Sequence, residues 1–251
     1  MGDEQGMFKE KMKAITFSYD DAVMQDIRLI EILNKYNLKA TFNLNSQLLG
    51  TSGFLNIEGV RVDNIKHKPE DIKYVYDGHE VAAHTLTHPK LTQIEDEKEI
   101  IRQVEQDRLN LSKLAGYEVK GMAYPCGAPN CDRRVADIIK NNTGIKYARS
   151  FNVTGGFEPF DDLFMYEGTM SHCENWDSFF EIGEKFLDLK AETPKIMYIW
   201  GHAFELDVNP KRWEQFEEFC KLISGKNDIF YGTNIEVFEC ISVQTISGLI
   251  K

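Results

Sequence analysis

Carboxylates and imidazoles stand at three places in this sequence where an apolar, strand-like stretch ends. The residues are Asp20 and Asp21, then His84 and His88, and finally His202. Because the carboxyl ends of parallel strands share one rim of an α/β fold, and active sites lie at that rim, we expect these side chains to come together. Two imidazoles and a carboxylate make an open ligand set for a divalent metal ion that activates water. The residues therefore make a metal site one candidate for this rim.

The adjacent acids Asp20 and Asp21 allow two interpretations. Neighbouring side chains at a strand end diverge, so one carboxylate can bind a cation while the other faces a cation-bound water. Alternatively, an aspartate between a strand and a helix caps the helix by accepting backbone N–H bonds. The sequence Tyr19-Asp20-Asp21-Ala22 fits both interpretations.

His84 and His88 are four residues apart, a spacing that on a helical turn places both imidazoles on one side. A zinc protease would need a glutamate directly after the first histidine, and Thr85 stands there. A third ligand must then come from another strand end, where an aspartate is available.

The other histidines have less specific settings. His202 follows an apolar strand and is either a hydrogen-bonded structural residue or a proton-transfer group at the rim. We interpret His79, next to Gly78, as structural. His172 is expected at the surface, with substrate contact as the alternative, and His67 carries no specific signal.

Four ordered segments resemble the motifs of the polysaccharide deacetylase family, also called the NodB-homology family or carbohydrate esterase family 4. They are Thr16 to Asp21, His79 to His88, Ala123 to Gly127, and the late His202. The resemblance extends over residues 14 to 240. The Asp-Asp pair followed by H-[ST]-x-x-H in this order is specific, although each piece alone is not.

The resemblance implies a role for each of the rim residues. Asp21, His84 and His88 would bind a divalent metal ion, Zn²⁺ first, with Co²⁺, Ni²⁺ or Mn²⁺ as alternatives. Asp20 would be the catalytic base that takes a proton from the attacking water. His202 would be the acid that protonates the departing amine.

The turn of residues 123–127 departs from the Arg-Pro-Pro-Tyr-Gly of the family, because it reads Ala-Tyr-Pro-Cys-Gly. The resemblance places the backbone N–H of Cys126 at the oxyanion, with Tyr124 and Pro125 beside the substrate. The family arginine that orients the base is missing, and we expect Arg149, at the end of the next predicted strand, to replace it. Trp200 and Tyr124 either stack on a sugar ring or pack in the core.

Three further positions qualify the resemblance. Ala22 stands where the family has glycine, and Asp161, Asp162 or Glu205 is expected to tune the acid histidine. A nucleophilic Cys126 would need an adjacent base and a covalent step that a metal hydrolase does not use. We therefore interpret Cys126 as a small residue that widens the cleft.

These residues need a scaffold of parallel strands and crossover helices. We expect an α/β fold, a distorted (β/α)7-type barrel over residues 14–240, with an N-terminal extension (1–13) and a C-terminal tail (241–251). The predicted strands are 14–19, 40–44, 80–83, 119–124, 146–149, 195–200 and 229–231. The predicted helices are 25–36, 94–114, 133–141, 176–189 and 210–223. Residues 45–79 predict only a small hairpin or lid.

Composition excludes several functions. The chain of 251 residues has 29 Lys and Arg against 40 Asp and Glu, a net charge of −11 that argues against a nucleic-acid groove. No apolar run approaches the length of a membrane span, and none near the start predicts a secretory signal. Five cysteines without C-x-x-C spacing predict reduced thiols in the cytoplasm, or a secreted protein if a leader has been removed. The sequence predicts no oligomeric state.

The residues and the resemblance together favour removal of an acetyl group from an N-acetylated oligosaccharide or polysaccharide. One alternative is an amidohydrolase that acts on a small non-sugar amide. Another is a carbohydrate-binding homologue of impaired activity, because the turn lacks the family arginine.

Overall fold

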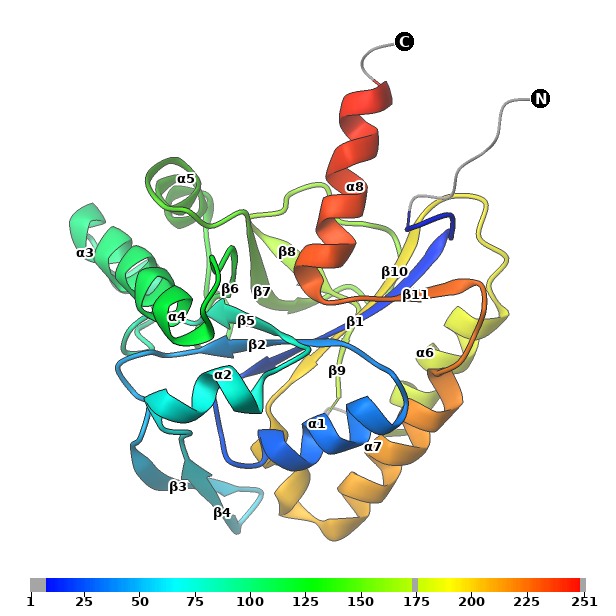
Figure 1. Cartoon of the computed structure of the whole chain (residues 1–251), viewed down its shortest axis with the longest axis horizontal. Helices are drawn as coiled ribbons and strands as arrows, with labels where there is room; N and C mark the ends of the chain where they lie inside the picture. Colours follow the sequence, from blue (N-terminus) through cyan, green and yellow to red (C-terminus); the bar gives the residue numbers. More distant parts are fainter. Residues whose placement is uncertain (1–7, 173–175, 249–251) are drawn as a thin grey trace.

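Strand β1 (Lys13–Asp20) is the central strand of the sheet, and all eight of its residues are buried. Its apolar Ile15, Phe17 and Tyr19 alternate with the polar Thr16, Ser18 and Asp20, so the two buried faces of the strand differ in character. It pairs in parallel with β10 (Lys195–Gly201) along one edge, and with β2 (Ala40–Leu44) and β11 (Ile229–Tyr231) along the other. The computed structural model shown in Figure 1 describes residues 8–172 and 176–248.

The remaining strands complete a distorted barrel. Their order is β8-β7-β6-β5-β2-β1-β10-β9, and every pairing in this sheet is parallel. Their bounds are β5 Glu80–Ala83, β6 Gly121–Ala123, β7 Tyr147–Val153, β8 Tyr166–Gly168 and β9 Met170–Ser171. The run 166–171 closes the barrel, because β8 pairs with β7 while β9 pairs with β10. The expected fold class is confirmed.

The seven predicted strands are present, with different bounds at some ends. The strand predicted over 119–124 is shorter, Gly121–Ala123, and the strand predicted over 146–149 is longer and extends to Val153. The barrel-closing run 166–171 was not expected, because Tyr-Glu-Gly-Thr-Met-Ser lacks an apolar run. Strand β11 instead pairs only with the first three residues of β1.

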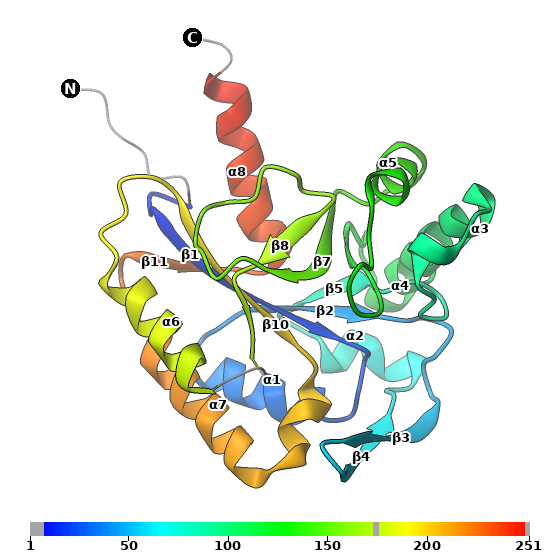
Figure 2. The ribbon, with the colours of Figure 1, turned by 180° about the vertical axis from the view of Figure 1, so that it is seen from behind.

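Helices cover the outside of the barrel, and α6 and α7 lie side by side in both views (Figures 1 and 2). Their bounds are α1 Asp26–Lys35, α2 Ile72–Val75, α3 Glu97–Ile101, α4 Asp107–Ala115, α5 Arg133–Asn142, α6 Trp176–Asp188, α7 Pro210–Ile223 and α8 Asn234–Gly248. Short 3-10 turns occur at Pro69–Asp71, Leu91–Gln93 and Ala203–Val208. Helix α8 crosses the boundary expected at residue 240.

The helix predicted over 94–114 is one helical run from Glu97 to Ala115 with a π-helical stretch, Arg102–Gln106, between α3 and α4. Such stretches expose backbone groups that a regular α-helix would use internally. Here the carbonyl of Gln103 accepts the N–H of Leu86 at 3.0 Å. The irregular turn thus holds the loop that carries the two motif histidines.

The segment that the sequence left open forms a hairpin of β3 (Ser52–Ile57) and β4 (Val60–Ile65). Its two turn residues, Glu58 and Gly59, both have positive φ, as a tight hairpin turn requires. The hairpin lies beside the segment that follows β1, because Met24 N–H donates to the Ile65 carbonyl at 2.9 Å. It therefore forms one wall next to the candidate site.

Within residues 8–172 and 176–248, no helix combines the length and the apolar character that crossing a bilayer would need.

Candidate active site

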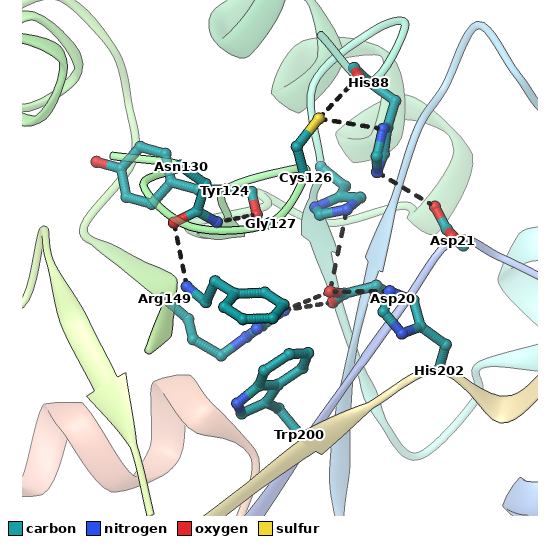
Figure 3. A pocket seen from close by; sticks show the side chains of 12 residues that line it. Asp20, Asp21, His88, Tyr124, Cys126, Gly127, Asn130, Arg149, Trp200 and His202 are labelled. Atoms are coloured by element: carbon teal, nitrogen blue, oxygen red, sulfur yellow. Dashed lines mark hydrogen bonds and ion pairs between the residues drawn. The ribbon is translucent and has the colours of Figure 1, made fainter. Parts of the chain in front are cut away.

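The residues singled out at the strand ends meet in one cavity of about 180 Å³ (Figure 3). Asp20 and Asp21 come from the end of β1, His84 and His88 from the loop after β5, and His202 from the residue after β10. The helix-capping alternative for the aspartates is not observed, because α1 begins at Asp26 without a side-chain cap.

Asp20 is buried and held by several donors. Arg149 Nη2 donates to both of its carboxylate oxygens, at 2.6 and 2.5 Å, and Asn43 Nδ2 donates to Oδ1 at 2.8 Å. Burial raises the pKa of this carboxyl, but the charges of Arg149, His84 and His202 outweigh it and hold the pKa below its ordinary value. Asp20 is therefore an ionised acceptor at neutral pH.

Asp21 turns away from Asp20 because the backbone leaves the strand in the left-handed region, with φ of 89° at Asp21 and 56° at Ala22. This conformation explains why glycine is the family residue at the position of Ala22. Burial raises the pKa of Asp21, but Lys66 and the nearby histidines lower it to about 2. The ammonium of Lys66 lies 3.6 Å from Asp21 Oδ1.

His84 is fixed in one orientation. Its Nδ1 lies 2.9 Å from the Ala123 carbonyl, so Nδ1 carries the hydrogen and Nε2 is left for a ligand. Its backbone N–H donates to the Asp107 carboxylate at 3.1 Å. Burial lowers the pKa of His84 to about 4, despite the opposing charge of Asp20. A neutral imidazole of this kind is a metal ligand.

The loop 84–88 does not form the helical turn that the four-residue spacing suggested. Thr85 and His88 both have positive φ, of 68° and 61°, and the rings of His84 and His88 lie 4.9 Å apart. Nine non-glycine residues in the described ranges have positive φ. Five of these lie in the loops of the site: Asp21, Ala22, Thr85, His88 and Cys126. Strained backbone of this kind concentrates at functional sites.

Asp21, His84 and His88 fit a divalent metal ion. One ligand atom from each lies within 4.8 Å of the others. An ionised carboxylate and a neutral imidazole with its outer nitrogen satisfied are the donors that such ions require. The site is a candidate metal centre, and the structure does not identify its metal.

Arg149 lies within hydrogen-bond distance of Asp20, as expected if it replaces the missing turn arginine. It comes from the third residue of β7 rather than from the end of the strand, because the strand continues to Val153. Its Nε also donates to Ser18 Oγ at 3.2 Å, and its guanidinium stacks 4.7 Å from the ring of Trp200. A cation this well buried is held by its partners in one position.

His202 is paired with Glu205, one of the three acids named as candidates. His202 Nδ1 lies 3.3 Å from Glu205 Oε1, and its Nε2 lies 3.9 Å from Asp20 Oδ2. Burial lowers the pKa of His202, but Glu205 and then Asp20 raise it to about 9. Asp161 and Asp162 show no contact with His202 among the described residues, where Asp162 pairs with Arg133.

The residues of the turn after β6 do not all face the site. Tyr124 and Cys126 line the cavity, whereas Pro125 is buried and lies outside the lining. The Tyr124 hydroxyl donates to the Phe164 carbonyl at 2.8 Å, so it packs rather than reaching a ligand. Cys126 Sγ lies 3.8 Å from His88 Nδ1, and burial raises the pKa of its thiol. A protonated thiol agrees with a non-nucleophilic Cys126.

Aromatic side chains form the wall opposite the metal ligands. Trp200 and Phe151 line the cavity with their rings 5.0 Å apart, and Trp200 is only 4% exposed, so it both packs and borders the cavity. A second cavity of about 400 Å³ lies on the hairpin side and shares Asp21 and His88 with the first. Lys66 lines that second cavity.

Several contributing residues were not identified from the sequence. Asn43, Lys66, Asn130 and Phe151 border the two cavities or hold their acids. Asn43 alone carried a usable signal, because it is a polar amide near the carboxyl end of a predicted strand.

Two of the minor histidines have clear outcomes. His79 is structural, as predicted, since its ring accepts the Ala40 N–H and contacts Asn34. The expectation of a surface position for His172 is wrong, because its side chain is fully buried between Tyr19 and Glu205. Cys173, its neighbour, lies outside the described residues.

Fold and site together define a class: a parallel α/β barrel with an Asp-His-His metal set at the carboxyl ends of its strands. The family model described as polysaccharide deacetylase matches residues 7–148. The chain belongs to the polysaccharide deacetylase family. No curated protein matches it in sequence.

Solved structures of low identity share the fold. One is a Mycobacterium smegmatis protein assigned by name to the polysaccharide deacetylases (TM-score 0.64, 15% identity, 94% of this chain and 92% of that chain covered). Another is the peptidoglycan deacetylase PdaC from Bacillus subtilis (TM-score 0.55, 18% identity, 95% and 96% covered). A third is a mutant of a CE4 family pseudoenzyme with restored enzymatic activity (TM-score 0.57, 16% identity, 89% of this chain and 66% of that chain covered).

Proposed function

We propose that this protein is a metal-dependent deacetylase that hydrolyses the acetamide group of an N-acetylated sugar. One observation carries the proposal: the Asp20 carboxylate and the His202 imidazole lie 3.9 Å apart beside the Asp-His-His set, with the pKa of Asp20 lowered and that of His202 raised. Two titratable groups whose pKa values are pushed apart in one site are suited to act as base and acid.

Asp21, His84 and His88 would hold the metal ion, with Zn²⁺ the first choice for two imidazoles and one carboxylate. When bound, the ion supplies Lewis acidity that polarises an amide carbonyl and lowers the pKa of a water molecule.

Asp20 acts as the base. It takes a proton from the water whose oxygen attacks the carbonyl carbon, and Arg149 and Asn43 keep its carboxylate aimed into the cavity. The backbone N–H of Cys126 is placed by the resemblance to donate to the oxygen that gains negative charge.

His202 acts as the acid. Its Nε2 side faces Asp20, and its Nδ1 lies 3.3 Å from Glu205 Oε1, so Nε2 gives its proton to the amine nitrogen as the C–N bond breaks. The products are a free amine and acetic acid, which releases its proton to solvent as acetate, and the proton taken by Asp20 balances the one given by His202.

The walls of the site support a sugar substrate. Phe151 and Trp200 offer aromatic faces on one side, and the second cavity continues beyond Asp21 and His88 toward Lys66. A ligand held at the metal set therefore has room on either side of it, as a chain of sugars would need.

A small non-sugar amide is the second candidate substrate. The cavity at the metal set, about 180 Å³, is smaller than the roughly 300–1,000 Å³ of ordinary ligand pockets. A homologue of impaired activity is less favoured. It was suggested by the arginine missing from the turn, and Arg149 donates to both oxygens of Asp20 in place of that arginine.

The experiment is to measure acetate release from N-acetylglucosamine oligosaccharides and from small N-acetylated amides, with the protein loaded with Zn²⁺ or Co²⁺. Asp20→Asn should abolish most of the rate, and His202→Ala should lower it by about 10²- to 10⁴-fold. His79→Ala is the matched control, since His79 is buried at the start of β5, the opposite end of the strand from His84. A His202→Ala protein with an unchanged rate would remove His202 from the mechanism, and no acetate from any substrate would contradict the proposal.

A further inference from the structure

His172 lies behind the acid histidine rather than in the cavity. It follows β9, is fully buried, and uses both of its ring nitrogens: Nδ1 lies 3.1 Å from the Tyr19 hydroxyl, and Nε2 lies 3.1 Å from Glu205 Oε2. Because a carboxylate can only accept, Nε2 carries a hydrogen and donates to Glu205, while Nδ1 is hydrogen-bonded to the Tyr19 hydroxyl.

The carboxylate of Glu205 is shared between the two histidines. Its Oε2 accepts from His172 and from the backbone N–H of His202, at 3.1 and 3.0 Å, while Oε1 lies 3.3 Å from His202 Nδ1. Two donors hold Oε2, and Oε1 faces the imidazole of His202.

The fit between His172 and the end of β10 is tight. A Cβ added to Gly201, the residue before His202, would lie 2.6 Å from the His172 ring. Aromatic rings pack around His172 as well, with Phe216 at 6.0 Å between ring centres. A phenylalanine at position 172 would fill the same space, so packing alone does not account for the two polar contacts.

We propose that His172 is a positioning residue for the reaction: it orients Glu205, and through Glu205 it sets the direction of the His202 imidazole, while Tyr19 holds the ring of His172 in place. This inference rests on the proposed role of His202 as the acid. It extends the catalytic arrangement by two buried residues that do not touch the substrate.

Few charged groups surround the hydrogen-bonded row of Tyr19, His172, Glu205 and His202 among the described residues. His202 faces Glu205 and, across the cavity, Asp20, with Asp21 contributing at longer range. Arg212 approaches Glu205 only at its backbone carbonyl, at 3.0 Å. A change in the titration of His202 after substitution at position 172 therefore reports on Glu205.

The experiment compares His172→Phe, His172→Gln and Tyr19→Phe in the full chain, with His79→Phe as the matched control of a buried histidine remote from the site. Acetate release is measured across pH, and histidine-ring ¹⁵N NMR follows the titration of His202. We expect His172→Phe to lower kcat about 10- to 100-fold with KM within about twofold, as for other residues that orient a reacting group. The His202 signal should move, and its midpoint should fall.

Tyr19→Phe should show the same changes at smaller size, and His172→Gln, which keeps a donor for Glu205, should restore most of kcat. If His172→Phe does not fold, these two variants still decide the question. The proposal is overturned if the His202 signal and midpoint are unchanged in the folded variants, or if His79→Phe loses as much kcat. Should the wild-type protein release no acetate, the proposed function fails, while the NMR comparison still tests the link from His172 to His202.

Discussion

Replacing Arg149 by methionine removes the cation that holds the base while keeping a side chain of similar length. Arg149 is 1% exposed and donates to both oxygens of Asp20, so the substitution leaves that carboxylate buried with Asn43 as its remaining uncharged donor. We expect burial, then opposed only by the charges of His84 and His202, to raise the pKa of Asp20 above its ordinary value.

The size of the effect follows from the burial. Removing one partner of a buried ion pair costs about 3–5 kcal/mol of unfolding free energy, and we expect about 3 kcal/mol at neutral pH because Asp20 can take up a proton. In the wild-type protein the lowered pKa of Asp20 contributes stability above pH 3.8 that is lost as the pH falls through its folded value. In the variant the raised pKa of Asp20 reverses the sign of this pH dependence, so ionisation of Asp20 then destabilises the folded state. The difference in unfolding free energy between the wild-type protein and the variant, called the stability gap below, therefore widens as the pH rises from 5 to 8.

Two measurements check this expectation. Urea unfolding of the metal-free protein at several pH values gives the stability gap, and kcat/KM against pH gives the ionisation of the base. The acid limb of the rate profile should move to higher pH in Arg149→Met. Arg108→Met is the matched control, because Arg108 is also buried but pairs with Glu105 and the Val119 carbonyl outside the site.

The reasoning would be refuted if Arg149→Met kept the wild-type acid limb, since Asp20 would then not depend on this arginine. A stability gap that stayed constant between pH 5 and 8 would likewise show that Asp20 does not titrate there. Arg108→Met should lose stability without any movement of the rate profile.

Three further expectations concern the metal set, the acid and the barrel. Metal analysis should find about one divalent ion per chain, and Asp21→Asn should reduce it, because a neutral amide is a weaker ligand than an ionised carboxylate; unchanged metal content would exclude Asp21. Burial lowers the pKa of His202, but Glu205 outweighs it and raises the pKa to about 9, so the protonated acid is present below that pH and is lost above it. In ¹⁵N NMR of the metal-free protein, the titration midpoint of His202 should therefore lie well above 6.5. Gly121→Ala should destabilise the barrel by about 1–3 kcal/mol in urea unfolding, because the added Cβ would overlap Tyr147.

The sequence alone determined the fold class and the metal set. Asp21, His84 and His88 are identifiable as candidate ligands because the Asp-Asp pair and the H-[ST]-x-x-H segment, in this order, resemble the motifs of the family. The strands themselves were visible as short β-rich runs that alternate with longer segments of helical periodicity.

The tertiary structure decided which distant residues complete the site. The contact of Arg149 with Asp20 spans 129 positions, and only the curvature of the barrel brings β7 across to β1. The loop 84–88 reaches its geometry through left-handed residues and the π-helical stretch behind it, not through the helical turn that its spacing suggested.

His172 shows the same limit most plainly. Beside Cys173 in a polar stretch it carries no signal of burial, and the sequence suggested the surface. Its place between Tyr19 and Glu205 depends on β9 lying against β10, a pairing of two residues that closes the barrel. Residue types and short spacings fix the metal ligands, whereas the groups that orient the base and the acid are fixed by strand pairings far apart in the chain.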